Sequence, residues 1–301
     1  FRSGRVLEPF DGEGEYLLDP FGSSPTFLLE AAQHRGVIVA ANNPVTRFVL
    51  RQRAMPPALA TMHAALARLA AAPKDHARLE PFILDLYRTE CARCGEAAIA
   101  DYFVWEREAE GPILKGYVCE RCSHAGEDPT TEADWARAQE HSRRGLQQAL
   151  ALEQVAPAGD PDRQHAEAAL AVYPARAIYA LISIVSKLEQ LDLDPAMAEA
   201  AQALLLSASD AANALWGHPE GRARPLALVA SPRYREINVW RALERAADEW
   251  ATAGPEVPLE DWQPGRLPAP GTISVYPGPA RDLVGHLPDP LKPAPLQTNP
   301  L

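Results

Sequence analysis

Four cysteines are the residues whose types and spacing most clearly indicate chemistry in this 301-residue chain. They form two C-x2-C pairs, CARC at 91–94 and CERC at 119–122. A two-residue spacing lets one tight turn direct two thiolates at a single ion, and two such turns complete the tetrahedron that zinc prefers. The sequence therefore predicts one zinc ion, which four thiolates would hold as a structural rather than a catalytic metal. The predicted ligands are Cys91, Cys94, Cys119 and Cys122.

Other interpretations of the cysteines stay open at this stage: four buried free thiols, or a redox role for one pair. Two tight pairs suit a metal in a reducing cytoplasm, the expected location, better than the disulfides of a secreted protein. His124 is expected to be a neighbour of the site and not a ligand. FVWE and KGYV, between the pairs, predict a hairpin that joins the two metal-binding turns as in a zinc ribbon.

Charge limits the partners that can be expected. The formal net charge is -11, the wrong sign for a protein whose whole surface binds nucleic acid. The cysteine region is acidic as well, so a protein partner or a purely structural role suits the ribbon at least as well as DNA. No apolar run approaches the ~20 residues that cross a bilayer, and no membrane partner is expected.

A second pattern with possible chemistry is LLDPFGSSPTFLLEAAQHRGVIVAANNP, from Leu17 to Pro44. A short apolar run ends at Asp19, small residues form a turn, a helix begins, and VIVAA then predicts a buried strand. A carboxylate at a strand end beside a helix N-terminus forms a polar site at the sheet edge, which suits an adenosyl cofactor. A plain strand–turn–helix corner without a ligand is the alternative.

The helices and strands that are predicted around these motifs indicate an α/β protein. A helical stretch over 45–88 is broken at Met55–Pro57, the pattern is helical from 131 to about 216, and TISVYPGPARDL returns to a strand. The expected parts are the first portion of a cofactor-binding domain, a helical connector, the zinc ribbon, a helical region and a Pro-rich return to the first domain. Their predicted ranges are 1–57, 58–88, 89–128, 129–222 and 223–301.

LLDPFGSSPT resembles the DPF-x-G-S-G-T cofactor loop of adenosylmethionine-dependent amino-methyltransferases that act on DNA, and VIVAANNP resembles their next strand, which usually ends D-x-N-P. A four-cysteine ribbon soon afterwards is a feature of the adenine-specific DNA methylases that contain a zinc ribbon. RFVLR and SPRYREINVWRALE also look like that group. The resemblance covers most of the chain, with sharp motifs only at 17–44 and 89–122. It implies a partial Rossmann-like methyltransferase sheet with an inserted zinc ribbon and a large helical region.

The resemblance also implies residue roles. Asp19 would make the first contact with S-adenosyl-L-methionine, and Asp282 would make an acidic contact toward adenine. The final TNPL lies where a catalytic tetrapeptide is expected, which makes Asn299 and Pro300 the catalytic candidates; SPRY at 231–234 is a second, weaker candidate. The residues implied to bind the cofactor are Asp19, Phe21, Gly22, Ser23, Ser24, Asn42 and Asp282.

The chain departs from the family pattern at several positions. Ser23 and Pro25 replace glycines, Ala41 stands where an acid normally binds the ribose hydroxyls, and TNPL lacks the tetrapeptide's aromatic residue. Both ends look cut from a longer protein, so the expectation is an incomplete amino-methyltransferase for DNA, with adenine as the target and DNA bound mainly by missing parts. The alternative is a non-catalytic zinc-ribbon module with a degenerate methyltransferase fold that docks a protein in a DNA-modifying or defence complex.

Overall fold

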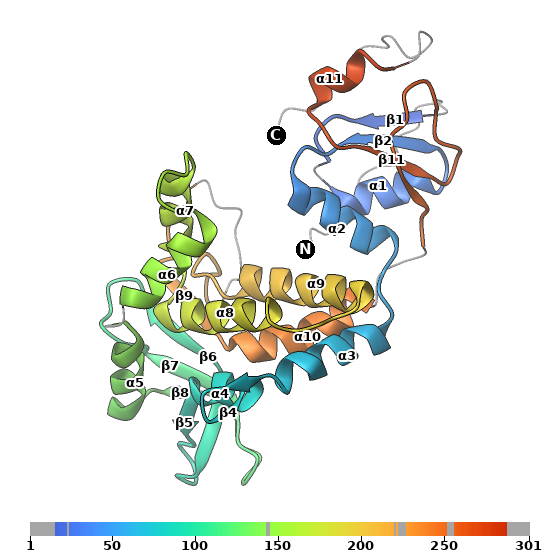
Figure 1. Ribbon diagram of the computed structural model, residues 1–301. Helices are drawn as coiled ribbons and strands as arrows, with labels where there is room; N and C mark the ends of the chain where they lie inside the picture. The colour runs from blue at the N-terminus through green and yellow to red at the C-terminus, as the bar shows by residue number, and fades with distance from the viewer. Residues whose placement is uncertain are drawn as a thin grey trace. The chain divides into compact units, whose positions relative to one another are not determined.

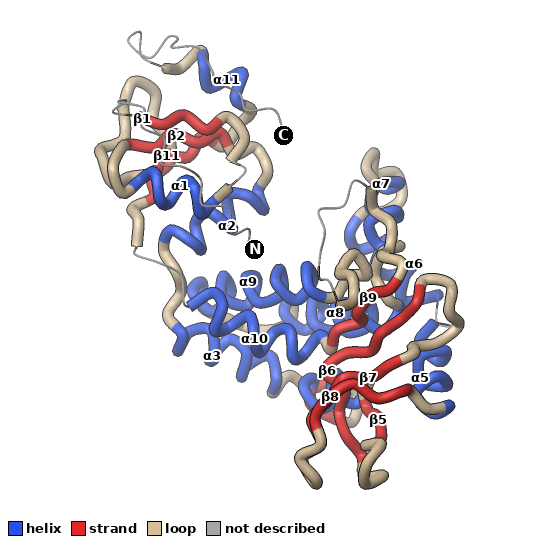
Figure 2. The backbone as a smooth tube through the Cα atoms, turned by 180° about the vertical axis from the view of Figure 1, so that it is seen from behind, coloured by secondary structure: helices blue, strands red, loops and turns tan. Residues whose placement is uncertain are grey.

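The structure is a computed structural model that describes residues 16–22, 24–142, 145–219, 221, 227–251 and 256–287. The chain forms two compact units, each with helices and strands (Figures 1 and 2). Phe1–Pro56 and Thr252–Leu301 make up the first unit, and Pro57–Ala251 makes up the second. The predicted mixed α/β class is therefore confirmed.

The first unit is built on a four-stranded sheet in the order β1-β2-β11-β10. All three neighbouring strand pairs are parallel, so the carboxyl ends of the strands lie at one edge of the sheet. Its strands are β1 Tyr16–Asp19, β2 Gly36–Ala40, β10 Leu259–Asp261 and β11 Ile273–Tyr276. Its helices are α1 Pro25–Ala32, α2 Pro44–Ala54 and α11 Ala280–Val284.

β2 lies at the centre of this unit, and all five of its residues are buried. Its apolar run is typical of a strand that is covered on both faces. Val37 and Val39 pack with Leu28 of α1 and Leu50 of α2. Ile38 packs on the other face, in a cluster that includes side chains from α11 and from the segment after β10. Each fully buried Val, Leu or Ile contributes about 1.5–3 kcal/mol, so β2 anchors the unit.

The predicted strand–helix–strand at the N-terminus and the predicted return strand at 273–276 are both present. β10, in contrast, was not predicted, and it lies in the Pro-rich part of the chain before that return strand. It has only three residues and lies at the edge of the sheet, where it pairs with β11 alone. So short a strand between prolines gives no periodic signal.

The second unit contains an antiparallel sheet in the order β5-β6-β7-β8, with β9 also paired to β6. The long β6 makes this possible, because residues 97–99 pair with β5 and residues 102–106 pair with β9. A small hairpin, β3 Pro73–Lys74 with β4 Ala77–Arg78, precedes the sheet. The strands of the sheet are β5 Arg88–Glu90, β6 Ala97–Glu106, β7 Leu114–Val118, β8 Ala125–Pro129 and β9 Arg233–Ile237.

Helices form the rest of this unit, and α10 packs against α3 and α9. Trp250 of α10 is buried and donates its indole N–H to the carbonyl oxygen of Ala203 at 3.0 Å. The helices are α3 Leu59–Ala70, α4 Leu79–Asp85, α5 Glu132–Ser142, α6 Gly145–Val155, α7 Arg163–Leu170, α8 Ala175–Leu188, α9 Pro195–Ala211 and α10 Val239–Ala251.

No single helix in the described ranges is long and apolar enough to cross a membrane. Among the described helices, α7 and α8 are long and apolar enough only when taken together, and a bend of 119° separates them.

The structure corrects the predicted start of the return to the first domain. The sequence placed it at 223, but β9 and α10 belong to the second unit, and the first unit resumes at Thr252. β9 pairs with β6, with Tyr234 opposite Trp105. Arg233 and Tyr234 of SPRY are thus strand residues of the antiparallel sheet, not part of a loop after a parallel strand. RYREI has no apolar run, because one of its buried side chains, Glu236, is charged and pairs with Arg176.

A buried ion pair joins α5 to β7 of the antiparallel sheet. Lys115 Nζ lies 3.2 Å from Asp134 Oδ2, and both side chains are only 1% exposed. Lys115 also donates to Thr89 Oγ1 at 3.0 Å and to the Glu90 carbonyl oxygen at 2.8 Å. Burial opposes the charged form of Asp134, but hydrogen bonds from Thr131 and Thr89 and the charge of Lys115 together hold its pKa below the usual range.

This lowered pKa predicts acid sensitivity of the second unit. A carboxyl whose folded pKa lies below its unfolded value, about 3.9, stabilises the fold fully above that value and loses this contribution as the pH falls through the folded pKa. We expect Asp134→Asn to lower the free energy of unfolding at pH 7 by about 1–3 kcal/mol and to flatten its dependence on acidic pH. Urea titrations followed by circular dichroism between pH 2 and 7 measure this.

Asp85→Asn is the matched control, because Asp85 forms an exposed ion pair with Arg88 at 2.8 Å. Its variant should follow the wild-type pH curve closely. Equal pH curves for Asp134→Asn and wild type would show that the Lys115–Asp134 pair contributes nothing to acid sensitivity.

Candidate functional site

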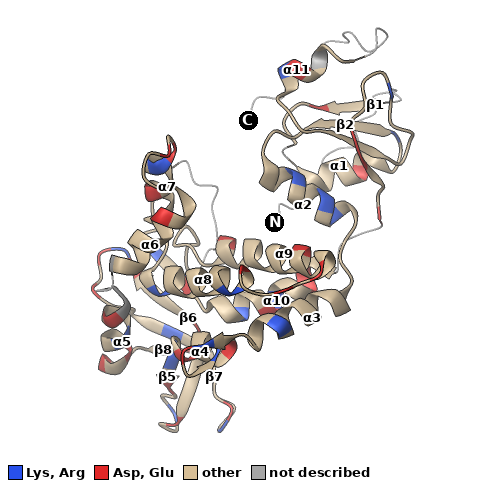
Figure 3. Ribbon diagram, viewed as in Figure 1, with Lys and Arg blue, Asp and Glu red and all other residues tan. Residues whose placement is uncertain are grey.

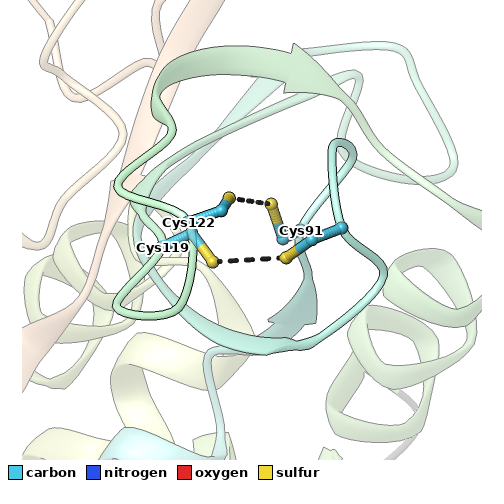
Figure 4. Close-up of side chains that lie close together, drawn as sticks. Cys91, Cys119 and Cys122 are labelled. Atoms are coloured by element: carbon cyan, nitrogen blue, oxygen red, sulfur yellow. Dashed lines mark hydrogen bonds between the residues drawn. The ribbon is translucent and has the colours of Figure 1, made fainter.

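The four cysteines come together at one end of the antiparallel sheet (Figure 4). Their four Sγ atoms all lie within 4.8 Å of one another. The Sγ atoms are 3.7 Å apart for Cys91 and Cys122, and also for Cys94 and Cys119. A tetrahedron with Zn–S distances of about 2.3 Å has S···S edges of about 3.8 Å, so this cluster has the size and the soft donor set for a metal ion such as zinc.

The sheet explains why the cysteines meet. Residues 91–96 connect β5 to β6, and residues 119–124 connect β7 to β8. Since β6 and β7 are antiparallel, the start of β6 and the end of β7 lie at the same end of the sheet. The two turns, which we call the knuckles, therefore face each other. The predicted hairpin between the two cysteine pairs is confirmed as β6 and β7.

The two knuckles have the same backbone geometry. The N–H of Gly95 donates to the Cys91 carbonyl oxygen at 2.9 Å, and the N–H of Ser123 donates to the Cys119 carbonyl oxygen at 2.8 Å. Gly95 has φ +73° and Ser123 has φ +56°, so each knuckle needs a left-handed residue after its second cysteine. A glycine is the residue expected in this conformation, whereas the serine of the second knuckle is not typical of it and gives no signal in the sequence.

His124 lies outside the cluster of four, as expected. Its Nε2 is 2.8 Å from Asp128 Oδ2, and its carbonyl oxygen accepts the N–H of Cys119 at 2.8 Å. His124 therefore takes part in the second knuckle through its backbone and supports β8 through its ring.

The second predicted site lies at the carboxyl edge of the parallel sheet in the first unit. The segments after β1, β2 and β11 all leave the sheet at this edge, because the three strands are parallel and in register. Asp19 lies level with Val39 of β2, and Tyr276 lies level with Ala40. The structure thus brings Asp19, its following turn and the segment with Asn42 to one edge.

Asp19 shapes the turn that follows it. Its Oδ1 accepts the N–H of Phe21 at 2.8 Å and the N–H of Gly22 at 3.0 Å. Gly22 has φ +59°, and a Cβ atom there would lie 3.2 Å from Thr46 Cγ2 and 3.3 Å from Val39 Cγ2. The turn closes onto β2 and α2, which only glycine permits at this position. Phe21 is 70% exposed beside it.

The other predicted cofactor residues have varied surroundings. Ser24 is the N-cap of α1, and its Oγ accepts the N–H of Phe27 at 3.4 Å. Asn42 is exposed. Asp282 lies in the first turn of α11 and forms an exposed ion pair with Arg281 at 3.4 Å. Ser23, Asn299 and Pro300 lie outside the described residues.

Arg47 is a residue of this edge whose role sequence reasoning missed. Its Nη1 donates to the carbonyl oxygens of Ala41 at 3.0 Å, Asn42 at 3.5 Å and Pro277 at 3.2 Å. It thereby ties the segment after β2 to the segment after β11. α2 carries three arginines, and its basic residues are coloured blue on the ribbon in Figure 3. The pattern could not show which of them contacts position 277, because that contact spans 230 positions.

In the described part of the second unit, the two best-formed hollows are lined by residues other than the predicted cofactor residues. The larger, of about 480 Å³, lies beside the knuckles between β5, β6 and α10. The smaller, of about 110 Å³, lies beside a buried ion pair between Arg176 and Glu236. Apolar and oppositely charged side chains line the larger hollow: Arg88, Ala97, Ala98, Ile99, Asp101, Val118, Glu120 and Arg241.

Comparisons of the chain with protein-family models, curated proteins and solved structures found no match.

Proposed function

We propose that the first unit binds S-adenosyl-L-methionine at the carboxyl edge of its sheet and serves methyl transfer to an exocyclic amine of DNA, with adenine as the base that the motif resemblance favours. One observation carries this proposal: the Asp19 turn and the Asn42 segment converge at that edge. Ligands of open parallel α/β sheets bind outside the carboxyl ends of the strands.

The chemistry of the edge suits the amino-acid part of this cofactor. A carboxylate such as Asp19 can accept hydrogen bonds from an ammonium group, and the partial positive charge at the N-terminus of α1 favours a nearby carboxylate. The exposed Asn42 offers an amide near the position where an acid would bind the ribose. This chain's residues would then orient the cofactor, and transfer to a flipped base depends mainly on such positioning.

We also propose that the cysteine cluster holds one Zn²⁺ through Cys91, Cys94, Cys119 and Cys122. Four thiolates saturate the ion, so its role would be to join the two knuckles and not to activate water.

Calorimetric titration with S-adenosyl-L-methionine tests the cofactor proposal. We expect binding by the wild type and 10- to 100-fold weaker binding by Asp19→Asn. Asparagine keeps an oxygen that can accept the N–H groups of Phe21 and Gly22, so the turn stays intact while the charge is lost. A charge-assisted hydrogen bond accounts for an effect of this size.

Asp261→Asn is the matched control. Asp261 is an exposed residue at the carboxyl end of β10 in the same sheet, so its loss should leave the affinity unchanged. Equal affinity of Asp19→Asn and wild type would remove Asp19 from the site.

A non-catalytic interaction module is the second candidate. It is favoured by the observation that Asp19 and Ser24 already accept hydrogen bonds from their own turn and helix, while a buried alanine, Ala41, replaces the ribose-binding acid. Absence of any heat of binding from the wild type at millimolar cofactor would favour this module.

A further inference from the structure

We propose that Tyr117 positions the two knuckles against each other and thereby sets the affinity of the site for zinc. The inference rests on the proposed zinc site but not on the proposed methyl transfer. It follows from a chain of hydrogen bonds that connects the knuckles without passing through a metal.

Tyr117 lies on β7, two residues before Cys119, and is buried. Its hydroxyl accepts the N–H of Ala92 at 2.7 Å and donates to Asp128 Oδ2 at 2.8 Å. Ala92 lies inside the first knuckle, between Cys91 and Cys94. One side chain of β7 thus holds the backbone of the knuckle that begins on β5.

Asp128 continues the chain to the second knuckle. Its Oδ2 is also 2.8 Å from Nε2 of His124, whose carbonyl oxygen accepts the N–H of Cys119. Hydrogen bonds from Tyr117 and His124 hold the pKa of Asp128 below its usual range, so the carboxylate stays an acceptor at neutral pH. Ala92, Tyr117, Asp128 and His124 together form a link between the two metal-binding turns.

This link matters because the ion must otherwise bring two separate turns together. Groups that hold metal ligands in place from outside the coordination sphere change metal affinity by roughly 10- to 100-fold when they are lost. Tyr117→Phe keeps the ring and its packing but leaves the Ala92 N–H and the Asp128 carboxylate without the hydroxyl. If Tyr117 served only to fill the core, this variant would bind zinc as tightly as the wild type.

The experiment measures the zinc dissociation constant by equilibrium competition with a chromophoric chelator. We expect Tyr117→Phe to bind one zinc per chain with 10- to 100-fold weaker affinity. The matched control is Tyr102→Phe, because the Tyr102 hydroxyl donates to Glu127 Oε1 at 2.7 Å on the same sheet without touching a knuckle. That variant should stay within about threefold of the wild type.

Two further measurements keep the test decisive. The Co²⁺ absorption spectrum should retain its tetrahedral thiolate bands in Tyr117→Phe, because the four ligands remain. Asp128→Asn tests the same link without changing the tyrosine, and we expect it to weaken zinc binding as well. It replaces Tyr117→Phe in the test if that variant is poorly folded. Zinc affinity equal to that of the wild type in Tyr117→Phe would overturn the inference. Equal weakening in Tyr117→Phe and Tyr102→Phe would also overturn it. Absence of zinc from the wild-type protein would instead overturn the metal assignment itself.

Discussion

Replacing Glu236 with alanine is expected to lower the free energy of unfolding of the second unit by about 3–5 kcal/mol. Glu236 of β9 and Arg176 of α8 form a bidentate ion pair, with Nε–Oε1 and Nη2–Oε2 distances of 2.9 Å. Both side chains are only 2% exposed. Removing the carboxylate leaves a guanidinium in an apolar interior without its counter-charge.

Both partners of the pair make further contacts, which would have to break if either side chain moved. Arg176 Nη1 donates to the Leu86 carbonyl oxygen at 2.9 Å, and its guanidinium carbon lies 4.5 Å from the ring centre of Phe103. Trp105 Nε1 donates to Glu236 Oε2 at 2.7 Å. Burial opposes the charge of Arg176, but Glu236 raises the pKa of Arg176, so the guanidinium stays charged. These contacts join the helical part of the unit to its sheet.

Urea unfolding followed by circular dichroism measures the effect, and two variants separate its causes. Arg176→Met combined with Glu236→Leu removes both charges while keeping volume, and we expect it to lie much closer to the wild type than Glu236→Ala. Arg241→Met breaks the part-exposed pair of Arg241 with Glu244 at 2.8 Å and should change stability by less than about 1 kcal/mol. Similar losses from Glu236→Ala and Arg241→Met would contradict the special role of the buried pair.

The Arg176–Glu236 pair also shows what sequence patterns miss. Arg176 lies in a helix whose apolar periodicity predicts the helix correctly but says nothing of a partner 60 positions away. The strand that carries Glu236, RYREI, has no apolar run, because its inward groups are partly charged and are satisfied by partners from other elements. Local sequence patterns therefore could not place this strand in the second unit. For the same reason, the predicted domain boundary at 223 differs from the one in the structure.

The cysteine site was predictable because its geometry is local. Each C-x2-C pair fixes two ligands through one turn, and the intervening hairpin brings the two turns to the same end of the sheet. The Asp19 turn was predictable for a similar reason, since strand, turn and helix follow within a few residues. The contacts of Arg47 with position 277 and of Tyr117 with position 92 depend on tertiary packing and carry no such local signature.

Loss of the proposed zinc ion is expected to have the largest effect on this protein. Structural zinc sites contribute apparent binding free energies of about 10–16 kcal/mol, which exceeds the stability of most domains. We expect purified wild-type protein to contain one zinc per chain and Cys91→Ser to contain almost none, by elemental analysis. Hydrogen exchange should then become fast in β5, β6, β7 and β8 of the variant, because the knuckles at their ends lose their common ion.

Exchange in β1, β2 and β11 should stay at the wild-type rate in the same sample, because their core is formed within the first unit. Ser123→Gly is the matched control in the second knuckle: it removes a side chain next to Cys122 but suits the φ of +56° better than serine, so zinc content and exchange should be preserved. A wild-type protein that is metal-free yet exchanges slowly in β6 and β7 would show that packing alone holds the knuckles. Slow exchange in β6 and β7 of Cys91→Ser would lead to the same conclusion.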